Sequence, residues 1–420
     1  MARLKVLLLI LVFALVAAAC GDDDAGTTTE GDTTATTSAA ATTSAAATTS
    51  APAAEPIVIG VLEDNAGGAA FYSQQASAVF KIAVDKINAD GGLLGRPVEV
   101  IFGSDDNDPT QAAVVVRKLI DQGADVLLLN SGSASATAAK AVLQEEEIVG
   151  IAPLNISSAI VTPPDADYTY IVANPITDVG VAYGMAFEGL GLSSIAIYRD
   201  DSPTIDFVTD LLRPFITDDI GVELTAEELV PLDALDVTAQ VTRIMNSNPD
   251  AVFISSLGGQ PEVLFYNTAQ TLGYEDTPFF SIASIGNMPE AWDLADPGAL
   301  DGLVFAGSIS ADNTNAQALI TVLTEELDGF RSLTAFHAQA WDSINMLAEA
   351  ITEAGTTDGP AVKAALESIS GFSATFGQPG FTLSFSPTKN SATDGLCGLV
   401  LVEFDGNAPG APWAFFQPTC

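Results

Sequence analysis

Apolar and polar residues follow two periods along most of this chain, one typical of strands and the other of helices. Between residues 56 and 152, short apolar runs are separated by longer segments with apolar positions three or four apart, as in amphipathic helices. This pattern predicts strands at 57–62, 98–102, 125–129 and 148–152 and helices at 74–88, 109–122 and 134–147. Strands that alternate with helices form parallel sheets covered by helices.

The pattern restarts after Pro175. It predicts strands at 194–198, 224–230, 251–255 and 279–282 and helices at 178–190, 204–216, 238–246 and 261–272. A strand at 304–309, helices at 315–328, 333–354 and 360–368, and strands near 381–385 and 399–404 complete the chain. A chain of 420 residues exceeds what one core usually organises. The fold class is therefore α/β, with two doubly wound parallel-sheet lobes.

The first 19 residues are typical of a secretion signal. Arg3 and Lys5 precede an apolar run at 6–16, which is shorter than the roughly 20 residues of a membrane span. Small residues at 17–19 then precede Cys20. This arrangement resembles a bacterial lipobox, which implies cleavage before Cys20 and lipidation of its sulfur, although Ala17 stands where leucine is commonest. The alternative is ordinary signal-peptidase cleavage.

Residues 20–55 are expected to be a disordered tether. After Cys20 the segment has no aromatic and no branched aliphatic residue, so it cannot bury enough apolar surface to offset the entropy of ordering. About 35 flexible residues span roughly 30 Å end to end, enough to keep a domain just off a membrane. The protein is thus expected outside the cytoplasm, on the outer face of the cell membrane.

Composition narrows the function classes. The net charge is −40, from 54 acidic and 14 basic residues, which disfavours binding to nucleic acid or anionic lipid. His337 is the only histidine, which argues against His-based triads and His-rich metal sites; its place beside Trp341 favours a packing or surface role. Neither a P-loop nor a dinucleotide fingerprint is present. We therefore predict no cofactor, no metal and no catalytic residue.

Two carboxylates could still form a hydrolase site, but acids are so numerous that no pair stands out. Three cysteines suit an oxidising compartment. With Cys20 assigned to the lipid, Cys397 and Cys420 remain as a possible disulfide.

Residues 87–112, INADGGLLGRPVEVIFGSDDNDPTQA, are the most informative stretch. A helix is expected to end near Asp90, and Gly91 and Gly92 supply the left-handed backbone that helix ends favour. Asp108 is expected to cap the next helix, with Pro109 at its first position. The stretch resembles the type I solute-binding proteins of branched-chain amino acid uptake systems, where an "IN…GG(I/L)xGRP" turn precedes a strand and a "DDxxDP" loop. The segment HAQAWDSINMLAEAI similarly resembles that family's "YDAxxxLAxAI" helix.

The resemblance implies a type I periplasmic binding protein fold, whose chain crosses between the lobes three times. Crossings near Asn174, Ser308 and Gly395 give lobes made of 56–174 with 308–394 and of 175–307 with 395–420. It also implies a monomeric, non-enzymatic protein that traps a small molecule and delivers it to the permease subunits of an ABC importer. The alternatives are a sensory receptor subunit of the same fold and, less favoured, a carboxylate-dependent hydrolase.

Ligand residues are expected in loops at the carboxyl ends of strands. The resemblance assigns Tyr72, in a Gly-rich loop, to the ligand side chain, although an aromatic residue at a helix start needs no such role. It assigns a ligand carboxylate to Ser131 and Ser133 before the next helix, a place that also favours anions electrostatically. Plain helix capping is the alternative for Ser133. Asn155 and Ser157, in the loop after the fourth strand, are expected to hold the same carboxylate.

The second lobe departs from the family pattern. Its candidates are Asp201, where relatives carry a Tyr–Gly pair nearby, and Gln260 and Ser284 in the next two loops. In amino-acid-binding relatives the last of these loops supplies an acid that pairs with the ligand ammonium, which neither Ala283 nor Ser284 can do. Substitutes for that acid are the carboxylates of Glu63, Asp64, Asp200 and Asp201. The expected ligand is therefore an amino acid, an amide or a related carboxylate.

Overall fold

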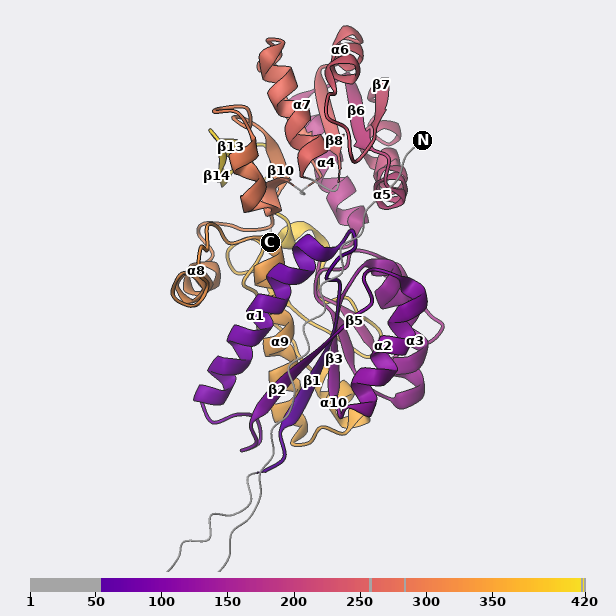
Figure 1. The fold of residues 1–420 in the computed structure, drawn as a ribbon, viewed down its shortest axis with the longest axis vertical. Helices are drawn as coiled ribbons and strands as arrows, with labels where there is room; N and C mark the ends of the chain where they lie inside the picture. Colours follow the sequence, from indigo (N-terminus) through magenta and orange to yellow (C-terminus); the bar gives the residue numbers. More distant parts are fainter. Residues whose placement is uncertain (1–53, 257–258, 283–284, 417, 419–420) are drawn as a thin grey trace, which may run out of the picture. The chain divides into compact units, whose positions relative to one another are not determined.

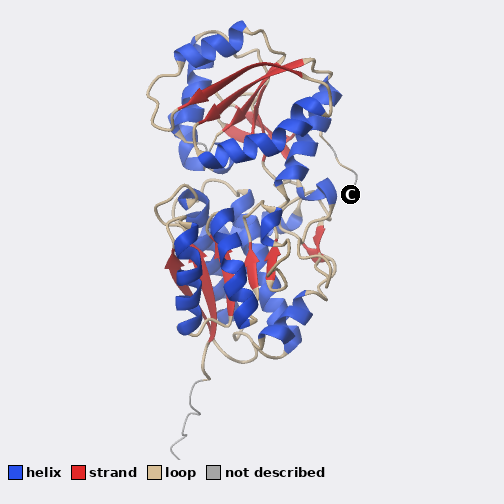
Figure 2. Ribbon diagram, turned by 90° about the vertical axis from the view of Figure 1, so that its right-hand side faces the viewer, coloured by secondary structure: helices blue, strands red, loops and turns tan. Residues whose placement is uncertain are grey.

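The computed structural model describes residues 54–256, 259–282, 285–416 and 418. The expected signal segment and nearly all of the tether, including Cys20, lie outside this range. The described chain forms two lobes, each built on its own sheet with helices packed against it (Figure 1, Figure 2). Within the described residues, no helix combines the length and apolarity needed to cross a membrane.

The first lobe contains a five-stranded, fully parallel sheet. Across the sheet, its strands are β2 (Val98–Ser104), β1 (Ile57–Glu63), β3 (Val126–Asn130), β4 (Gly150–Ala152) and β5 (Thr169–Ile171). Every residue of β3 is buried, as expected for a strand covered on both faces. Helices α1 (Ala70–Ala89) and α9 (Ala335–Ala354) pack together on one side, and α2 (Pro109–Asp121) and α3 (Ser133–Glu146) on the other (Figure 1).

The second lobe contains a seven-stranded sheet in which β6 to β10 run parallel to one another. Across the sheet, the strands are β14 (Ala408–Pro412), β13 (Leu401–Asp405), β10 (Val304–Ala306), β9 (Phe279–Ser281), β8 (Ala251–Ser255), β6 (Ser194–Asp200) and β7 (Glu223–Val230). Successive side chains of β6 point to opposite faces: Ile195 and Ile197 join one apolar core, and Ala196 and Tyr198 join the other.

Both faces of the second sheet are therefore covered. Its helices are α4 (Ile176–Leu190), α5 (Pro203–Arg213), α6 (Thr238–Asn246) and α7 (Gln260–Thr271). Short helical turns are η1 (Ser158–Ile160) in the first lobe, and η2 (Pro214–Asp218), η3 (Ile285–Asn287), η4 (Pro289–Leu294) and η5 (Gly395–Gly398).

After β10, the chain returns to the first sheet. Helices α8 (Thr314–Glu326), α9 and α10 (Gly359–Leu366) bury their apolar side chains in the first lobe's core. The small hairpin of β11 (Phe372–Ser373) and β12 (Thr382–Leu383) packs against the same core. Strands β13 and β14 then join the second sheet. Three crossings between lobes produce such a pattern, and the boundaries at Asn174, Ser308 and Gly395 remain predictions.

The structure differs from the sequence-based expectation at several elements. Strand β5 was not expected, because three residues are too few to show a period. Strands β13 and β14 are antiparallel additions to an otherwise parallel sheet, and β14 contains two prolines, which strands tolerate at an edge. Helix α1 begins at Ala70, so Tyr72 lies within its first turn and not in the preceding loop.

The turn and cap expected within 87–112 are confirmed. Gly91 and Gly92 have φ angles of +105° and +78°. The Asp108 carboxylate accepts a hydrogen bond from the Thr110 N–H at 2.9 Å, and Pro109 follows at the start of α2. These contacts fix where β2 ends and therefore where the loop 105–108 lies at the carboxyl edge of the first sheet.

Candidate ligand site

Three of the predicted ligand residues lie together at the carboxyl edge of the first sheet. Ser131 follows β3 directly and is fully buried. The Asn155 side-chain N–H donates to the Ser131 carbonyl oxygen at 2.8 Å and, more weakly, to the Ser133 hydroxyl at 3.5 Å. The loops after β3 and β4 are thereby joined around the start of α3.

The start of α3 has the features of an anion site. Its N-cap residue is Gly132, so no side chain satisfies the first N–H groups, which have no acceptor inside the helix. A Cβ at Gly132 would meet the Asn107 side-chain oxygen at 1.9 Å, so a larger residue there would displace the Asn107 side chain. Ser133 is half-buried on the first turn. The hydroxyl of Ser135 is buried without a hydrogen-bond partner among the described residues.

Ser131 itself is not free to donate to an anion. Its hydroxyl donates to Asp105 Oδ1 at 2.6 Å, and that oxygen also accepts the Asn107 N–H at 3.0 Å. Asp105 was not among the residues predicted from the sequence, although it opens the DDNDP segment at 105–109 and directly follows β2. That position, at the carboxyl end of a strand, was the signal that could have identified it.

Two oxygen atoms beside Ser131 lack hydrogen-bond partners among the described residues. They are Asp105 Oδ2 and Asn155 Oδ1. Asp105 is only 3% exposed and Asn155 only 2% exposed. Buried acceptors are nearly always hydrogen-bonded in folded proteins, so a pair without donors at one edge of a sheet requires an explanation.

Tyr72 lies in an aromatic cluster near these oxygens. Its ring centroid is 5.1 Å from that of Phe71 and 5.4 Å from that of Phe336 on α9. Burial raises the pKa of the Tyr72 phenol, and the nearby charges of Asp64 and Asp105 raise it further. The phenol therefore stays neutral and can donate a hydrogen bond.

The acids proposed from the sequence to pair with a ligand ammonium are already engaged. Both Glu63 oxygens accept hydrogen bonds, from Asn65 at 3.0 Å and Ser77 at 2.7 Å. Asp64 accepts three backbone N–H groups of the loop before α1, at residues 66, 67 and 69. In the second lobe, Asp200 accepts from Ser202 and Ser256, and the exposed Asp201 accepts the Leu232 N–H at 3.1 Å.

Glu262 is a second buried acid that the sequence analysis missed. It lies in the first turn of α7 and accepts hydrogen bonds from Tyr266 at 2.9 Å and Ser281 at 2.5 Å. Burial raises its pKa to about 7, although hydrogen bonds from Ser281, from Tyr266 and from the Ile285 backbone oppose the shift. Its Oε2 makes no hydrogen bond of ordinary geometry. This carboxyl is thus only partly ionised at neutral pH.

The remaining predicted residues are not gathered at α3. Ser157 caps η1 through the Ala159 N–H at 3.3 Å, and Gln260 is exposed at the start of α7. Ser284 lies outside the described residues. Ser157 also lines a cavity of about 450 Å³ between the loop after β4 and helices α4 and α5.

A family model described as "Periplasmic binding protein" matches residues 56–394. The chain is a member of the periplasmic binding protein family. Membership makes it an extracytoplasmic solute-binding protein. It resembles the "Amino acid binding protein" of Pseudomonas aeruginosa, with 25% identity over 48% of this chain and 54% of that protein, so the match spans about half the length of that relative. It is also 20% identical to "Leu/Ile/Val-binding protein homolog 2" of Brucella abortus, over 79% of this chain and 88% of that one.

Solved structures of other binding proteins share the fold. The branched-chain amino acid transporter substrate binding protein LivJ of Streptococcus pneumoniae, in complex with isoleucine, has a TM-score of 0.71 and 20% identity, covering 85% of this chain and 98% of that one. A solute binding protein of an ABC transporter from Rhodopseudomonas palustris BisB5, in complex with 3,4-dihydroxy benzoic acid, has a TM-score of 0.70 and 16% identity, covering 86% and 98%. Identities this low establish the fold alone.

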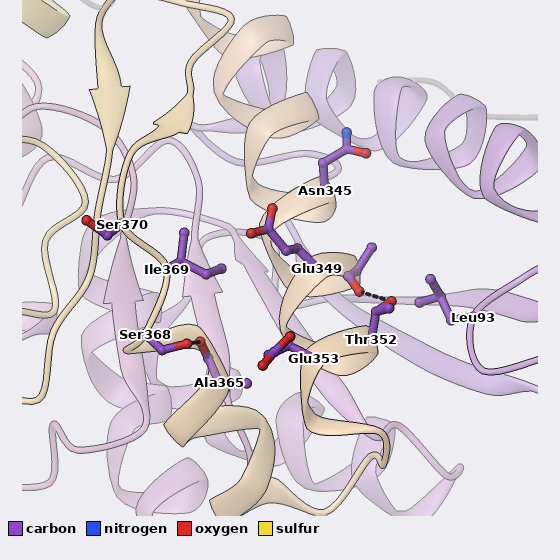
Figure 3. Close-up of a pocket in the computed structure, with 10 residues that line it drawn as sticks. Leu93, Asn345, Glu349, Thr352, Glu353, Ala365, Ser368, Ile369 and Ser370 are labelled. Carbon is purple, nitrogen blue, oxygen red and sulfur yellow. Dashed lines mark hydrogen bonds between the residues drawn. The ribbon is translucent and has the colours of Figure 1, made fainter.

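This binding protein has another cavity, of about 600 Å³, which does not suit a ligand site (Figure 3). It lies between α9 and α10 and includes Leu93, which precedes β2 and thus marks the amino end of that strand. Two of its hydroxyls are already bonded to nearby backbone: Thr352 donates to the Ala348 carbonyl oxygen and Ser368 to the Ala365 carbonyl oxygen, each at 2.7 Å. The cavity therefore lies away from the carboxyl ends of the strands.

His337 has a structural role in the binding protein. Its Nδ1 accepts the Thr334 N–H at 3.2 Å, and the Thr334 hydroxyl accepts the His337 N–H, which together form a capping box at the start of α9. Burial lowers the His337 pKa to about 4, so the ring stays neutral at physiological pH. Within the described residues, no group of three or more His, Cys, Asp or Glu side chains could hold a metal ion.

Proposed function

We propose that this protein captures a small carboxylate-bearing solute at the start of α3 and delivers it to an ABC importer. The observation that carries the proposal is the uncapped N-terminus of α3, with the Ser133 hydroxyl beside it and the buried Ser135 hydroxyl in the same turn. Backbone N–H groups and the helix dipole favour an anion there. Amino-acid-binding relatives and the benzoate-type ligand of one neighbour support a carboxylate as the common group.

Lobe closure is the proposed mechanism of capture and delivery. Asn287 of η3, in the second lobe, accepts a hydrogen bond from the Gln75 side chain at 3.0 Å through its carbonyl oxygen. Its side-chain oxygen accepts the Ala335 N–H of α9 at 3.1 Å. These bonds connect first-lobe helices α1 and α9 to the second lobe. A ligand that touches both lobes would favour the closed arrangement, which the permease would recognise.

The ligand class can be tested by calorimetric titration. The probes are the twenty standard amino acids, their deaminated acids, small amides and hydroxylated benzoates. The Ser133→Ala variant should bind the best probe roughly ten- to a hundredfold more weakly, because hydrogen bonds to a charged group contribute about 1.5–3 kcal/mol. Ser368→Ala, in the cavity between α9 and α10, is the matched control and should bind normally. Equal affinity of Ser133→Ala and the parent would contradict the anion site.

We further propose that the protein is anchored by lipid on Cys20 and held off the membrane by the Thr/Ser/Ala tether. The lipobox-like segment and the family's extracytoplasmic location support this. In a bacterial host that processes lipoproteins, Cys20→Ser should move the protein from the membrane fraction to the medium or periplasm. A protein that fractionates identically with and without Cys20 would contradict the anchor.

Turnover of any bound probe would contradict the non-enzymatic role.

A further inference from the structure

We infer that Asp105, together with Asn155, receives the ammonium group of the ligand, so that the preferred solute is an α-amino acid. The inference rests on the proposed function, because it assigns the cationic half of the same ligand. It also supplies what the loop containing Ala283 and Ser284 lacks, an acid for that ammonium.

The first argument is the unsatisfied hydrogen-bonding capacity beside Ser131. Asp105 Oδ2 and Asn155 Oδ1 are both acceptors, and both lack donors among the described residues. A buried acceptor that loses its hydrogen bonds to water and gains none from the protein destabilises the folded state, and an unpaired buried charge does so more strongly. An ammonium group has three N–H donors, which can bond both oxygens, and a positive charge, which pairs with the Asp105 carboxylate.

The second argument is the direction of the existing hydrogen bonds. The Ser131 hydroxyl gives its proton to Asp105 Oδ1, and the Asn155 side-chain N–H groups point to Ser131 O and Ser133 Oγ. The donors of this group are therefore spent inside the protein, and acceptors remain. These remaining acceptors favour a hydrogen-bond donor of the ligand and disfavour a ligand carboxylate beside Asp105.

The third argument is charge balance across a short distance. Asp105 binds Ser131, and Ser133, two residues later, begins the helix that offers N–H groups to an anion. A ligand with only a carboxylate would meet the Asp105 charge as well as the helix. A zwitterion places its negative group at α3 and its positive group at Asp105, so both interactions become favourable.

The other acids that could pair with the ammonium are already hydrogen-bonded or lie elsewhere. Glu63 and Asp64 use both oxygens on internal donors, and so does Asp200. Asp201 is exposed and tied to the loop after β7. Glu262 is a further buried acid, but it lies in the second lobe, where it accepts hydrogen bonds from Tyr266 and Ser281. It therefore serves as the competing assignment in the experiment.

Tyr72 explains how the ligand reaches these oxygens. Both oxygens are shielded from solvent in this structure, so a covering group must move when the ligand enters. The Tyr72 phenol lies near enough to Asp105 for that charge to raise its pKa, and its ring packs against Phe71, Phe336 and the apolar core of the first lobe. In this proposal Tyr72 is the covering group, and its side chain rotates when the ligand enters.

The experiment compares each amino acid with its deaminated acid, beginning with L-leucine and 4-methylpentanoate, by isothermal titration. The full-length exported protein should prefer the amino acid of the best pair. Asp105→Asn should weaken amino acid binding by roughly 30-fold or more, because it removes one member of a buried charge pair. The same variant should bind the deaminated acid as well as the parent or better.

Asp342→Asn is the matched control, because Asp342 is also a buried aspartate of the first lobe. Its Oδ2 accepts the Thr375 N–H, and its Oδ1 has no hydrogen-bond partner among the described residues. This variant should leave both affinities unchanged. The parent's preference between the two probes of a pair tests the inference even if Asp105→Asn fails to fold.

The outcomes separate the inference from the proposed function. If amino acids bind and Asp105→Asn matches the parent, or if Glu262→Gln causes the loss instead, the inference is wrong and the proposed function stands. The same holds if only deaminated acids bind. If no amino acid, acid or amide binds at all, the proposed function itself fails, and the inference fails with it.

Discussion

The side-chain amide of Asn174 donates a hydrogen bond to the carbonyl oxygen of Gly395, 221 residues further along the chain, at 3.1 Å. The same amide also donates to Asp178 at the start of α4, at 3.1 Å. Asn174 and Gly395 lie at the first and third of the predicted crossings between the lobes. The two segments predicted to connect the lobes are therefore bonded to each other.

The close approach of η5 to Asn174 predicts that Gly398→Ala destabilises the protein. A Cβ at Gly398 would lie 2.1 Å from Asn174 Oδ1, so one of the two segments must shift. Overpacking of this kind costs about 1–3 kcal/mol, which urea unfolding would measure. The control is Gly189→Ala in α4, where a Cβ meets nothing within 4 Å and alanine favours the helix. Equal stability of the two variants would contradict the prediction.

The turn after α1 predicts a contrast between two adjacent glycines. Both Gly91 and Gly92 have positive φ, so alanine is strained at either position. At Gly92 a Cβ would also lie 2.0 Å from the Arg96 carbonyl oxygen, whereas at Gly91 it would meet nothing within 4 Å. Gly91→Ala should cost about 1–2 kcal/mol, and Gly92→Ala clearly more. Thermal unfolding of both variants would show whether the order is as expected.

Asp342 predicts a pH-dependent stability difference. Burial raises its pKa to about 7, although hydrogen bonds from the Thr375 side chain and from the Thr375 and Phe376 backbone lower it in part. In the unfolded chain an aspartate has a pKa near 3.9, so between about pH 4 and 7 the folded state holds a proton that the unfolded state has released. The contribution of Asp342 to the free energy of unfolding should therefore fall as the pH rises through this window and level off above it.

The neutral variant Asp342→Asn removes this effect. It should match the parent near pH 4 and exceed its stability by roughly 2–4 kcal/mol at pH 8, since each pKa unit corresponds to about 1.4 kcal/mol. Urea unfolding of both proteins at pH 4, 5.5, 7 and 8 gives the difference directly. Other acids titrate equally in both proteins and cancel. A difference that does not change with pH would show that Asp342 is ionised in the folded state.

Cys397 is disulfide-bonded. Its predicted partner, Cys420, lies outside the described residues, so the pairing remains a prediction. The bond would close a loop of about 22 residues and stabilise the protein by roughly 3 kcal/mol. Mass spectrometry of peptides from the exported protein, before and after reduction, should find Cys397 and Cys420 in one unreduced species. Two alkylatable thiols without reduction would contradict the pairing.

The elements of the fold were predictable because apolar spacing alone distinguishes strands from helices. Helix α6 and strand β8 begin and end where the periodicity places them. Strand β14 was not predictable, because Pro409 and Pro412 oppose strand formation and the strand exists only by pairing with β13. The start of α1 was missed because the hydrogen bonds that Asp64 accepts from the backbone of the loop before the helix leave no trace in the spacing of apolar residues.

The candidate site was predictable only at the level of loops. Ser131, Ser133 and Asn155 follow neighbouring strands, so their proximity follows from topology. The direction of each hydrogen bond does not, and it is the Asp105 carboxylate that turns Ser131 from a donor for the ligand into a donor for the protein. Likewise, the spacing of α7 cannot reveal that Glu262 is buried against Ser281.

The hydrogen bond from Gln75 to Asn287 has a consequence for how tightly occupancy and shape are linked. Gln75 follows Tyr72 by three residues on α1, so their side chains share one face of that helix. Any rotation of this helical turn that moves the Tyr72 ring also moves the Gln75 side chain, which bonds Asn287 of the second lobe. If the protein serves an importer as proposed, the permease would sense an occupied site through the position of this single helical turn.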